Sequence, residues 1–438
     1  MSETSIPELL SLFDRASGVT TDSRKCGPGM LYVALKGERF DGNAFALDAL
    51  DKGCIGAVVD NASIVGDGIH YVTDGLTTLQ QLARAHRRRF EGPVFGLTGS
   101  NGKTTTKELI KSVLGRKLSV HATVGNLNNH IGVPLTLLSL PLDAEFALIE
   151  MGANHQGEIA ALCAIAEPTH GMITNVGLAH LEGFGGVEGV KKGKQELYKY
   201  LAASNGTAIV NAEDPDLMSL SGLEGLQRIP YGNAAHPPHA WRTDGAVDAP
   251  IIWAAHSSKG DSGKHQVEGP LKVHLQGAHQ LANMQAAIAV GHHFGVPKQD
   301  INVALEAFQP VDQRGEAVKT AHNHIIVDCY NANPSSVEST LRSFASSGHN
   351  APLAILGDMK ELGEHAAEGH RMVMDVAHVC GLECWTVGMD FHQYAAGDRS
   401  FASMEALRHD LEATPLSGRT ILLKGSRSMR MERLVEVL

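Results

Sequence analysis

The stretch Gly96-Leu97-Thr98-Gly99-Ser100-Asn101-Gly102-Lys103-Thr104-Thr105-Thr106 links an apolar run to a helical pattern. Residues 94–98 predict a buried strand, and residues 103–118 predict a helix. Where a strand enters a helix through glycines, backbone N–H groups and the positive end of the helix dipole can bind phosphate oxygens. Lys103 would then reach the β- and γ-phosphates of a nucleotide, and the Thr104 hydroxyl would hold Mg²⁺. The stretch therefore predicts a nucleotide-binding loop in an α/β domain.

The glycines of this loop do not follow the strict G-x4-G-K-[ST] spacing, because Leu97 stands five residues before Gly102. The nearest glycines are Gly96 and Gly99. A chance Gly-Lys-Thr sequence on a surface loop is the alternative interpretation, and the flanking strand and helix argue against it. Because switch GTPases also contain a phosphate loop, the loop alone does not identify the reaction.

Beyond the loop, apolar runs alternate with helical patterns in three zones, and the turn residues 91–93 mark the first boundary. The predicted strands are, zone by zone, residues 30–35 and 55–59; 94–98, 146–150, 172–175 and 208–211; and 324–327, 353–356, 384–387 and 420–423. Such alternation implies right-handed crossovers and mainly parallel sheets, which bind ligands at the carboxyl ends of their strands. We therefore predict three α/β domains, over residues 1–91, 92–312 and 313–438.

Two segments carry expectations of their own. A helix predicted over residues 76–90 ends in the basic run 84–89, which we interpret as water-exposed cations at the negative end of the helix dipole. Residues 235–268 are polar and show little periodicity, so they predict a surface insertion or short strands.

The composition is that of an ordinary globular protein, with 438 residues of which 43% are hydrophobic and 19% charged. The net charge of −11 argues against a broad nucleic-acid-binding surface. No apolar run approaches the ~20 residues of a membrane-spanning helix, and the N-terminus lacks the basic start of a secretory signal. The six cysteines lack paired zinc-site spacing. We expect a cytoplasmic, monomeric enzyme with no nucleic-acid partner and no membrane insertion.

Three side chains are candidates for a metal site. Glu150 ends a predicted strand at the edge where the phosphate loop is expected, and Mg²⁺ prefers hard oxygen ligands. His180 also follows a strand end, which distinguishes it from most of the 23 histidines. Lys194 lies in a basic segment that is typical of a solvated helix. An ammonium has no lone pair, so Lys194 could bind a metal only after carbamylation by CO₂.

The chain resembles the Mur ligase superfamily, ATP-dependent amide-forming enzymes of bacterial peptidoglycan synthesis, over essentially its whole length. The shared features are residues 98–105, Glu150, residues 175–180, Lys194 with Glu196, His279 with Asn283, and Arg314. The resemblance implies an N-terminal α/β uridine-nucleotide domain, a central P-loop ATPase-type domain and a C-terminal Rossmann-like α/β domain.

More specific motifs lie at residues 22–42, 125–134, 330–334 and 356–363. They resemble the superfamily member that joins D-alanyl-D-alanine to UDP-N-acetylmuramoyl-tripeptide through an acyl phosphate. The resemblance thus implies these two substrates, with ATP and two Mg²⁺ ions as cofactors and a carbamate on Lys194.

The resemblance also implies a role for each matching residue. Thr104 and Glu150 would hold one Mg²⁺, and Glu150, His180 and carbamylated Lys194 a second; Lys103 and the inter-domain Arg314 would act on the phosphates. The other nucleotide contacts in the loop would be Gly99, Ser100, Asn101, Gly102 and Thr105. Asn175 and Asn283 would contact the adenine, and Asp328 would contact the ribose. The substrate contacts would be Ser23, Arg24, Lys36, Asp41, Asn126, Asn128, Asn129, Tyr330, Asn331 and Asn333.

Three positions depart from the pattern of the superfamily. Asn43 stands where a histidine is usual, Gln280 where an asparagine is usual, and the segment before Arg314 lacks its usual glycine. Several of the matching residues also have structural alternatives. Asn126, Asn128 and Asn129 could be turn residues, and Asp328 could cap the next helix.

The alternative functions are another ligase of the superfamily, such as a tripeptide-forming Mur ligase or folylpolyglutamate synthase, and a non-ligating P-loop ATPase.

Overall fold

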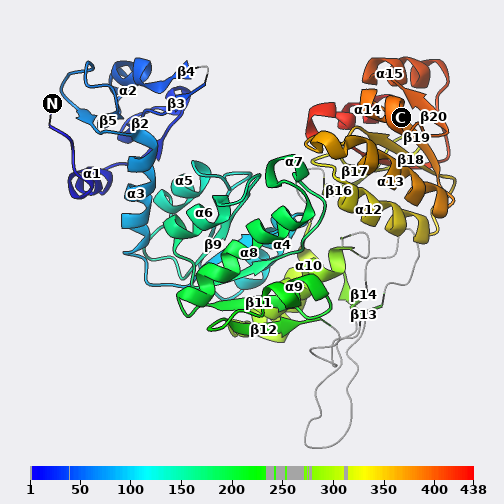
Figure 1. Cartoon of the computed structure of the whole chain (residues 1–438), viewed down its shortest axis with the longest axis horizontal. Coiled ribbons are helices and arrows are strands. Elements are labelled where there is room, and N and C mark those ends of the chain that lie inside the picture. The colour runs from blue at the N-terminus through cyan, green and yellow to red at the C-terminus, as the bar shows by residue number, and fades with distance from the viewer. Residues whose placement is uncertain are drawn as a thin grey trace, which may run out of the picture.

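Three α/β units follow one another along the chain, as the sequence predicts (Figure 1). The structure is a computed structural model that describes residues 2–38, 40–232, 241–242, 252–253, 271–273, 275, 279–309 and 314–438. In Figure 1 the N-terminal unit lies at the upper left, the C-terminal unit at the upper right, and the central unit between and below them.

The N-terminal unit is built on a four-stranded parallel sheet in the order β1-β2-β5-β6. Its strands are β1 (Gly18–Thr20), β2 (Met30–Val33), β5 (Gly56–Val59) and β6 (Ile69–Tyr71), with a separate hairpin of β3 (Lys36–Gly37) and β4 (Phe40–Asp41). Its helices are α1 (Ile6–Phe13), α2 (Ala46–Asp51) and α3 (Gly75–Arg87), and η1 (Ser23–Lys25) and η2 (Gly42–Phe45) are 3₁₀ turns.

The central unit contains a six-stranded, entirely parallel sheet in the order β12-β11-β10-β7-β9-β8. The strands are β7 (Val94–Thr98), β8 (Val120–Ala122), β9 (Phe146–Glu150), β10 (His170–Ile173), β11 (Thr207–Asn211) and β12 (Gln227–Tyr231). The chain leaves β7 toward one edge of the sheet and later returns to β10 on its other side. The loops after these strands diverge at such a reversal, which leaves space for a ligand beyond the end of β7.

Helices cover both faces of this sheet. Along β9, Phe146 and Leu148 pack with α4, α10 and α11, whereas Ala147 and Ile149 share a core with α5, α6 and α8. A strand buried on both faces is expected in a parallel sheet. The helices are α4 (Lys103–Leu114), α5 (Gly132–Leu138), α6 (Glu158–Ala166), α7 (Leu181–Phe184), α8 (Val187–Ala203), α9 (Pro215–Leu220), α10 (His279–His293) and α11 (Lys298–Ala307).

The C-terminal unit has a six-stranded sheet in the order β16-β17-β21-β18-β19-β20. The strands are β16 (Arg314–Lys319), β17 (His324–Asp328), β18 (Pro352–Gly357), β19 (Glu383–Val387), β20 (Arg399–Phe401) and β21 (Thr420–Lys424). The edge strand β16 is antiparallel to β17, which the sequence did not indicate, and the other pairs are parallel. The helices are α12 (Pro334–Ser346), α13 (Ala366–Val379), α14 (Met389–Tyr394) and α15 (Met404–Ala413), with the 3₁₀ turns η3 (Gly363–His365), η4 (Arg427–Met429) and η5 (Met431–Glu436).

Some predicted boundaries differ from the structure. The helix after the phosphate loop ends at Leu114 rather than at residue 118, and Gly115 follows it, as expected of a residue with low helix propensity. Strand β10 ends at Ile173, so Asn175 lies in the following loop. Short antiparallel strands β13 (Trp241–Arg242), β14 (Ile252–Trp253) and β15 (Leu271–Lys272) occur in and just after the polar segment. The rest of that segment lies outside the described residues, as does the predicted boundary at 312–313.

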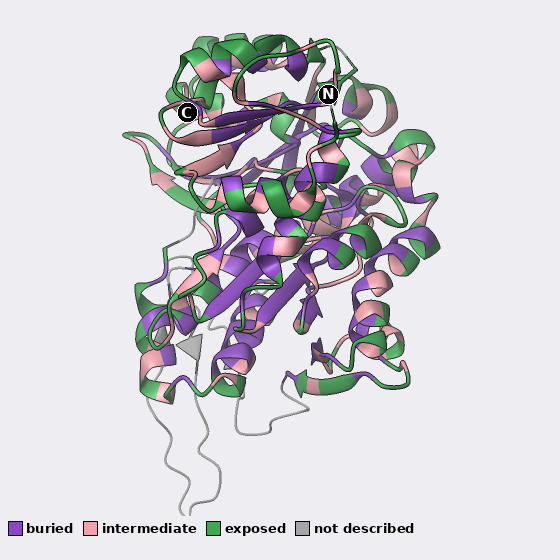
Figure 2. Ribbon diagram, turned by 90° about the vertical axis from the view of Figure 1, so that its left-hand side faces the viewer, coloured by how far each residue is buried: buried purple, intermediate pink, exposed green. Residues whose placement is uncertain are grey.

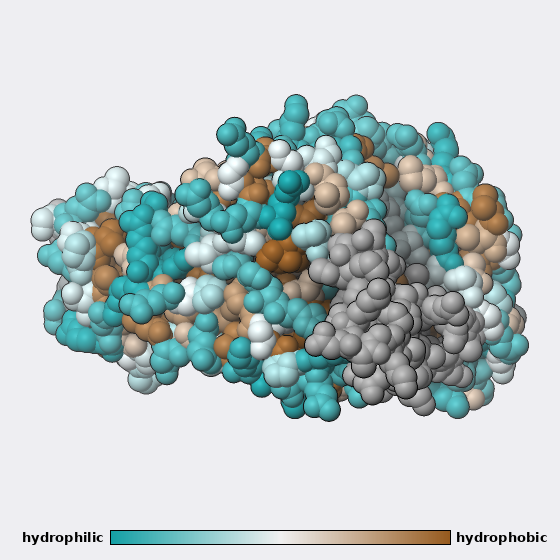
Figure 3. Space-filling view, turned by 90° about the horizontal axis from the view of Figure 1, so that it is seen from below, coloured by the Kyte–Doolittle hydropathy of each residue, from teal (hydrophilic) through white to brown (hydrophobic). Residues whose placement is uncertain are grey.

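Buried residues follow the strands of the sheets, and exposed residues lie mainly on the outer helices and loops (Figure 2). Seen from below, polar side chains cover most of the visible face, and apolar ones form small separate groups (Figure 3). Within the described residues, no helix combines the length and the apolar composition needed to cross a lipid bilayer.

The prediction that the basic run at the end of α3 faces water is wrong for Arg87. Arg87 is only 7% exposed, and its guanidinium donates to the carbonyl oxygens of Ala166 (2.7 Å), Glu167 (2.8 Å) and Phe90 (3.2 Å). Arg84 and Arg88 form ion pairs with the Glu167 carboxylate. Since Glu167 follows α6 of the central unit, these arginines fasten the N-terminal unit to the central one.

Replacing Arg87 with alanine leaves buried carbonyl oxygens without their donor. We expect Arg87→Ala to lower the free energy of unfolding by at least about 1–3 kcal/mol, the cost of one unpaired buried acceptor. Arg89→Ala is the matched control, because Arg89 forms an exposed ion pair with Asp14, and such a pair contributes about 1 kcal/mol or less. Calorimetric unfolding of both variants measures the difference. Equal stability of the two would contradict the fastening role of Arg87.

Candidate active site

A cavity of about 970 Å³ lies where the phosphate loop meets the C-terminal unit. Its walls come from the ends of β7, β9 and β10 in the central unit and from β17, α12 and β21 in the C-terminal unit. Most of the predicted nucleotide and metal residues line it: Ser100, Asn101, Gly102, Lys103, Thr104, Thr105, Glu150, Asn175, His180, Asn283 and Asp328. The structure thus gathers residues that are far apart in the sequence around one space.

The phosphate loop is held in shape by glycine geometry and by Asn175. Gly99 and Gly102 have φ angles of +147° and +76°, which other residues rarely adopt. The Asn175 side chain accepts from the backbone N–H of Asn101 and donates to its carbonyl, both at 3.0 Å. The Lys103 ammonium lies 2.5 Å from the Gly99 carbonyl oxygen. The loop is therefore preorganised, with its lysine folded back over it.

Glu150 is the carboxylate at the floor of the cavity. It is 2% exposed, and it accepts hydrogen bonds from the Thr104 hydroxyl (3.1 Å) and the Asn128 side-chain amide (2.8 Å). The ammonium of Lys107, which is fully buried, lies 3.4 Å from the Glu150 carboxylate. These hard oxygen atoms suit a divalent cation such as Mg²⁺, and Lys107 partly compensates the buried negative charge.

Lys194 lies inside the protein, on α8, rather than on a solvated face. It is 1% exposed; its Nζ is 3.4 Å from the Ala153 carbonyl oxygen and 5.0 Å from the centre of the Phe184 ring. Burial, and secondarily the charge of Lys103, holds the pKa of Lys194 well below its ordinary value. The shift favours the neutral amine over the ammonium. Neighbouring Glu196 has a structural partner, since it accepts from the backbone N–H groups of Gly157 and Ala160 at the start of α6.

His180 is brought to the cavity from the start of α7, with a φ angle of +53°. Its Nδ1 atom lies 2.6 Å from a carboxylate oxygen of Glu361 in the C-terminal unit. Nε2 is thus the ring nitrogen left for a ligand.

The predicted adenine and ribose contacts lie on two sides of the cavity. The Asn283 side chain accepts from the Thr106 hydroxyl at 3.0 Å and donates to Gln280 at 2.8 Å, so Gln280 supports Asn283 directly. Asp328 ends β17 and forms an ion pair with the buried Lys424 ammonium.

The predicted peptide contacts divide into two groups. Asn126, Asn128, Asn129, Tyr330 and Asn331 line the cavity. Asn333 instead caps α12 and donates to the Asn101 side chain at 2.7 Å, which joins the C-terminal unit to the phosphate loop.

Some predicted residues lie outside the cavity. Ser23, Arg24, Lys36 and Asp41 belong to the N-terminal unit, where Arg24 pairs with Asp22 and Lys36 with Asp60. Asn43, which departs from the superfamily pattern, is 2% exposed and bridges Asp41 and Asp60. Arg314 begins β16, opposite Asp328. The side chains of Arg314 and His279 lie outside the description.

The structure places at the site three residues that the sequence did not indicate, Lys107, Ser335 and Lys424, and it gives a contact to Glu361, which lies in the motif at residues 356–363 but had no predicted role. Lys107 follows Lys103 by one helical turn, a spacing that could have revealed it. Ser335 accepts from the backbone N–H of Leu178 across the two units at 2.8 Å. Contacts of that kind depend on how units pack, and no local pattern indicates them.

Comparison with known proteins gives one consistent result. The chain matches the Mur ligase family, catalytic domain, over residues 15–87, the Mur ligase middle domain over 97–291, and the Mur ligase, glutamate ligase domain over 313–427. It is 34% identical to the UDP-N-acetylmuramoyl-tripeptide–D-alanyl-D-alanine ligases of Bacillus subtilis (96% of this chain, 92% of that protein) and Escherichia coli (96% and 93%).

Solved structures agree with these relatives. A crystal structure of MurF from Acinetobacter baumannii is 29% identical, with a TM-score of 0.86 over 100% of this chain and 98% of that one. MurF ligase from Thermotoga maritima in complex with ADP is also 29% identical, with a TM-score of 0.82 over 97% of each chain.

A methyl group at Gly99 would disturb the phosphate loop in two ways. Its Cβ would lie 1.9 Å from the Thr174 hydroxyl oxygen, and the φ angle of +147° strains any other residue. We expect Gly99→Ala to weaken ATP binding at least about tenfold, equivalent to ~1.4 kcal/mol. Gly27→Ala is the control, because a Cβ there meets no atom within 4 Å. Calorimetric titration with ATP measures both variants, and unchanged affinity in Gly99→Ala would refute the steric argument.

Proposed function

The chain belongs to the Mur ligase family, and we propose that it is the member that joins D-alanyl-D-alanine to UDP-N-acetylmuramoyl-tripeptide. The reaction uses ATP, forms a carbon–nitrogen bond, and yields the UDP-muramoyl-pentapeptide precursor of peptidoglycan with ADP and phosphate. The observation that carries this proposal is the end-to-end match to relatives of that name, each covering 96% of this chain. The ADP complex of a similar structure supports the use of ATP.

The reaction brings anions together, and the residues of the cavity counter their repulsion. The γ-phosphoryl group moves to the terminal carboxylate of the tripeptide and forms an acyl phosphate. The amine of D-alanyl-D-alanine then attacks the acyl carbon, and phosphate leaves as the amide bond forms. Lys103 and the N–H groups of the loop stabilise the charge on the transferred phosphoryl group. Catalysis rests on alignment and charge, not on a protein nucleophile.

We propose two Mg²⁺ sites in this cavity. Thr104 and Glu150 would hold one ion, and Glu150, His180 and a carbamylated Lys194 the other. The buried carboxylate, which accepts from Thr104 at 3.1 Å, and the free Nε2 of His180 fit such ions. When bound, the cations would supply the charge compensation that phosphoryl transfer between anions requires.

The carbamate on Lys194 is chemically accessible. A neutral amine attacks CO₂, a nitrogen–carbon bond forms, and the nitrogen loses a proton to water. Burial lowers the pKa of Lys194 and so favours the reactive neutral form. The product would carry oxygen ligands and a negative charge, which a bound cation would stabilise.

We assign the rest of the molecule accordingly. Residues 1–91 would bind the uridine nucleotide, with Ser23, Arg24, Lys36 and Asp41 as contacts, 92–312 would bind ATP, and 313–438 would close over it. The proposed nucleotide contacts are Asn175, Asn283 and Asp328, with Arg314 on the phosphates. The peptide contacts would be Asn126, Asn128, Asn129, Tyr330, Asn331 and Asn333. We further propose a cytoplasmic monomer.

Phosphate release tests the proposed reaction directly. With ATP, Mg²⁺ and UDP-muramoyl-tripeptide, release should depend on D-alanyl-D-alanine, and mass analysis should show the pentapeptide. Both diaminopimelate- and lysine-containing tripeptides should be tried. Activity with a muramoyl dipeptide, or with folate and glutamate, would instead indicate a sister ligase. ATP hydrolysis that is independent of any acceptor amine would indicate a non-ligating ATPase.

The Lys103 side chain should be essential for turnover but not for folding. We expect Lys103→Ala to lower kcat at least about 100-fold, because the transferred charge loses its nearest cation. Lys111→Ala on the exposed side of the same helix is the control and should keep full activity. Circular dichroism should show that both variants are folded. Full turnover in folded Lys103→Ala would show that Lys103 does not stabilise the transferred phosphoryl group.

The carbamate has a spectroscopic test. We expect ¹³C NMR of protein equilibrated with ¹³C-bicarbonate and Mg²⁺ to show a carbamate resonance that is absent in Lys194→Arg. Lys192→Arg, an exposed neighbour, should keep the resonance. We expect kcat to fall about 10–100-fold or more in Lys194→Arg only. The same resonance in wild type and Lys194→Arg would disprove carbamylation of Lys194.

A further inference from the structure

The segment 358–363, here called the docking loop, has no role in the reaction described so far. It follows β18 and belongs to the motif at residues 356–363 that the sequence singled out. The loop reaches the central unit at α7. A carboxylate oxygen of Glu361 lies 2.6 Å from Nδ1 of His180, and Gly363 faces Glu182, whose Cβ would lie 2.9 Å from a Cβ added there.

The two residues that meet across the units are both in a strained backbone conformation. His180 has φ +53° and Glu361 has φ +67°, although neither is a glycine. Such conformations cost about 1 kcal/mol or more and persist only when their surroundings impose them. The central unit therefore holds His180 in position, and the C-terminal unit holds Glu361 in position.

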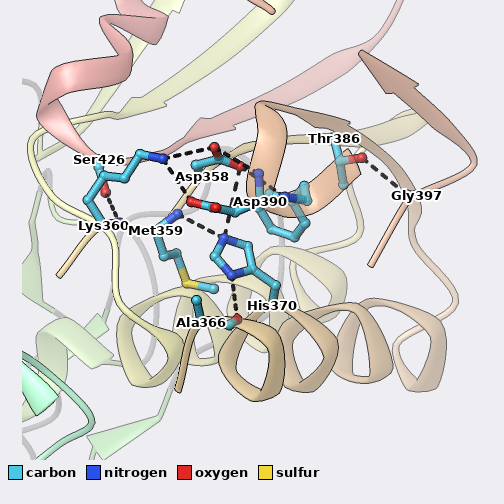
Figure 4. A network of polar contacts seen from close by, with 10 residues as sticks. Asp358, Met359, Lys360, Ala366, His370, Thr386, Asp390, Gly397 and Ser426 are labelled. Atoms are coloured by element: carbon cyan, nitrogen blue, oxygen red, sulfur yellow. Dashed lines mark hydrogen bonds and ion pairs between the residues drawn. The ribbon is translucent and has the colours of Figure 1, made fainter. Parts of the chain in front are cut away.

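A network of polar contacts fixes the docking loop from within the C-terminal unit (Figure 4). The Lys360 ammonium lies 3.1 Å from the Asp358 carboxylate and 2.8 Å from that of Asp390. The backbone N–H of Lys360 donates to the Ser426 hydroxyl at 2.9 Å, and that of Met359 donates to Nε2 of His370 at 3.1 Å. The residues that immediately precede the strained Glu361 are thus anchored.

Asp358, His370 and Asp390 are close enough to suggest a metal site, since one ligand atom from each lies within 4.8 Å of the others. Their hydrogen bonds argue against it. His370 Nε2 accepts from a backbone N–H, so its lone pair is used, and Nδ1 then donates to the Ala366 carbonyl at 2.7 Å. The Lys360 ammonium occupies the position between the two carboxylates. The cluster is an anchor for the loop.

We propose that Glu361 is a positioning residue that sets the tautomer and direction of the His180 ring, an inference that rests on the proposed function. A carboxylate on Nδ1 accepts the ring proton there, so the Nε2 lone pair is free to bind a ligand in the cavity. Because Glu361 comes from the other unit, His180 is oriented only when the C-terminal unit is docked. The docking loop therefore couples closure to assembly of the active site.

NMR of the histidine rings tests this proposal without any substrate. In protein labelled with ¹⁵N-histidine at pH 8, assigned with His180→Gln, wild-type His180 should carry its proton on Nδ1. In Glu361→Ala the population should move to Nε2–H. Glu361→Gln, which keeps an acceptor oxygen, should retain most of the Nδ1–H form. Glu364→Gln, an exposed carboxylate of the neighbouring turn, is the control and should match wild type. An unchanged His180 tautomer in Glu361→Ala would overturn the proposal.

Kinetics give the second readout. We expect Glu361→Ala to lower kcat about 10–100-fold, the usual effect of removing a partner of a metal-binding histidine, with the KM for ATP unchanged within about twofold. Glu361→Gln should recover most of kcat. Full kcat in Glu361→Ala, or an equal loss in Glu364→Gln, would also overturn the proposal. A wild-type protein that makes no pentapeptide would refute the proposed function instead, while the tautomer result would still stand.

Discussion

The structure of the site depends on one buried negative charge. The Glu150 carboxylate ends an inner strand of a parallel sheet and is only 2% exposed, so an unpaired charge there would be costly. Thr104 and Lys107 approach it from the phosphate-loop helix and Asn128 from the asparagine-rich loop. Because these partners come from two separate segments, satisfying this one charge fixes the phosphate-loop helix against the loop that contains Asn128. The same requirement makes the position suitable for a divalent cation.

The C-terminal unit completes this arrangement through contacts with the central unit. Asn333 bonds to Asn101 in the phosphate loop, Ser335 to the backbone of Leu178, and Glu361 to His180. Polar contacts of this kind between domains can separate and re-form. In the proposed reaction, such contacts would let the C-terminal unit release the product and still align the reactants.

The fold was largely predictable because β/α alternation is a local signal. The strands at 94–98 and 146–150 are confirmed residue for residue, since continuous apolar runs mark strands buried on both faces. Antiparallel β16 was not indicated, because pairing direction is not encoded within a strand. The basic run that contains Arg87 was predicted to face water, and the pattern around Lys194 is equally typical of a solvated helix, yet both side chains are buried, since a basic run looks the same whether it faces water or the interior. The assigned roles of Asn175, Asn283 and Arg314 rest on resemblance and stay predictions.

The arginines of α3 have a consequence for substrate length. By fastening the N-terminal unit to the end of α6, Arg84, Arg87 and Arg88 fix the distance between the proposed uridine site and the phosphate loop. A substrate held at its nucleotide end would then place its reacting carboxylate at the phosphoryl group only if its peptide had the right number of residues. The contacts between α3 and the end of α6 would thus select substrates by the length of their peptide, without contacting the peptide itself.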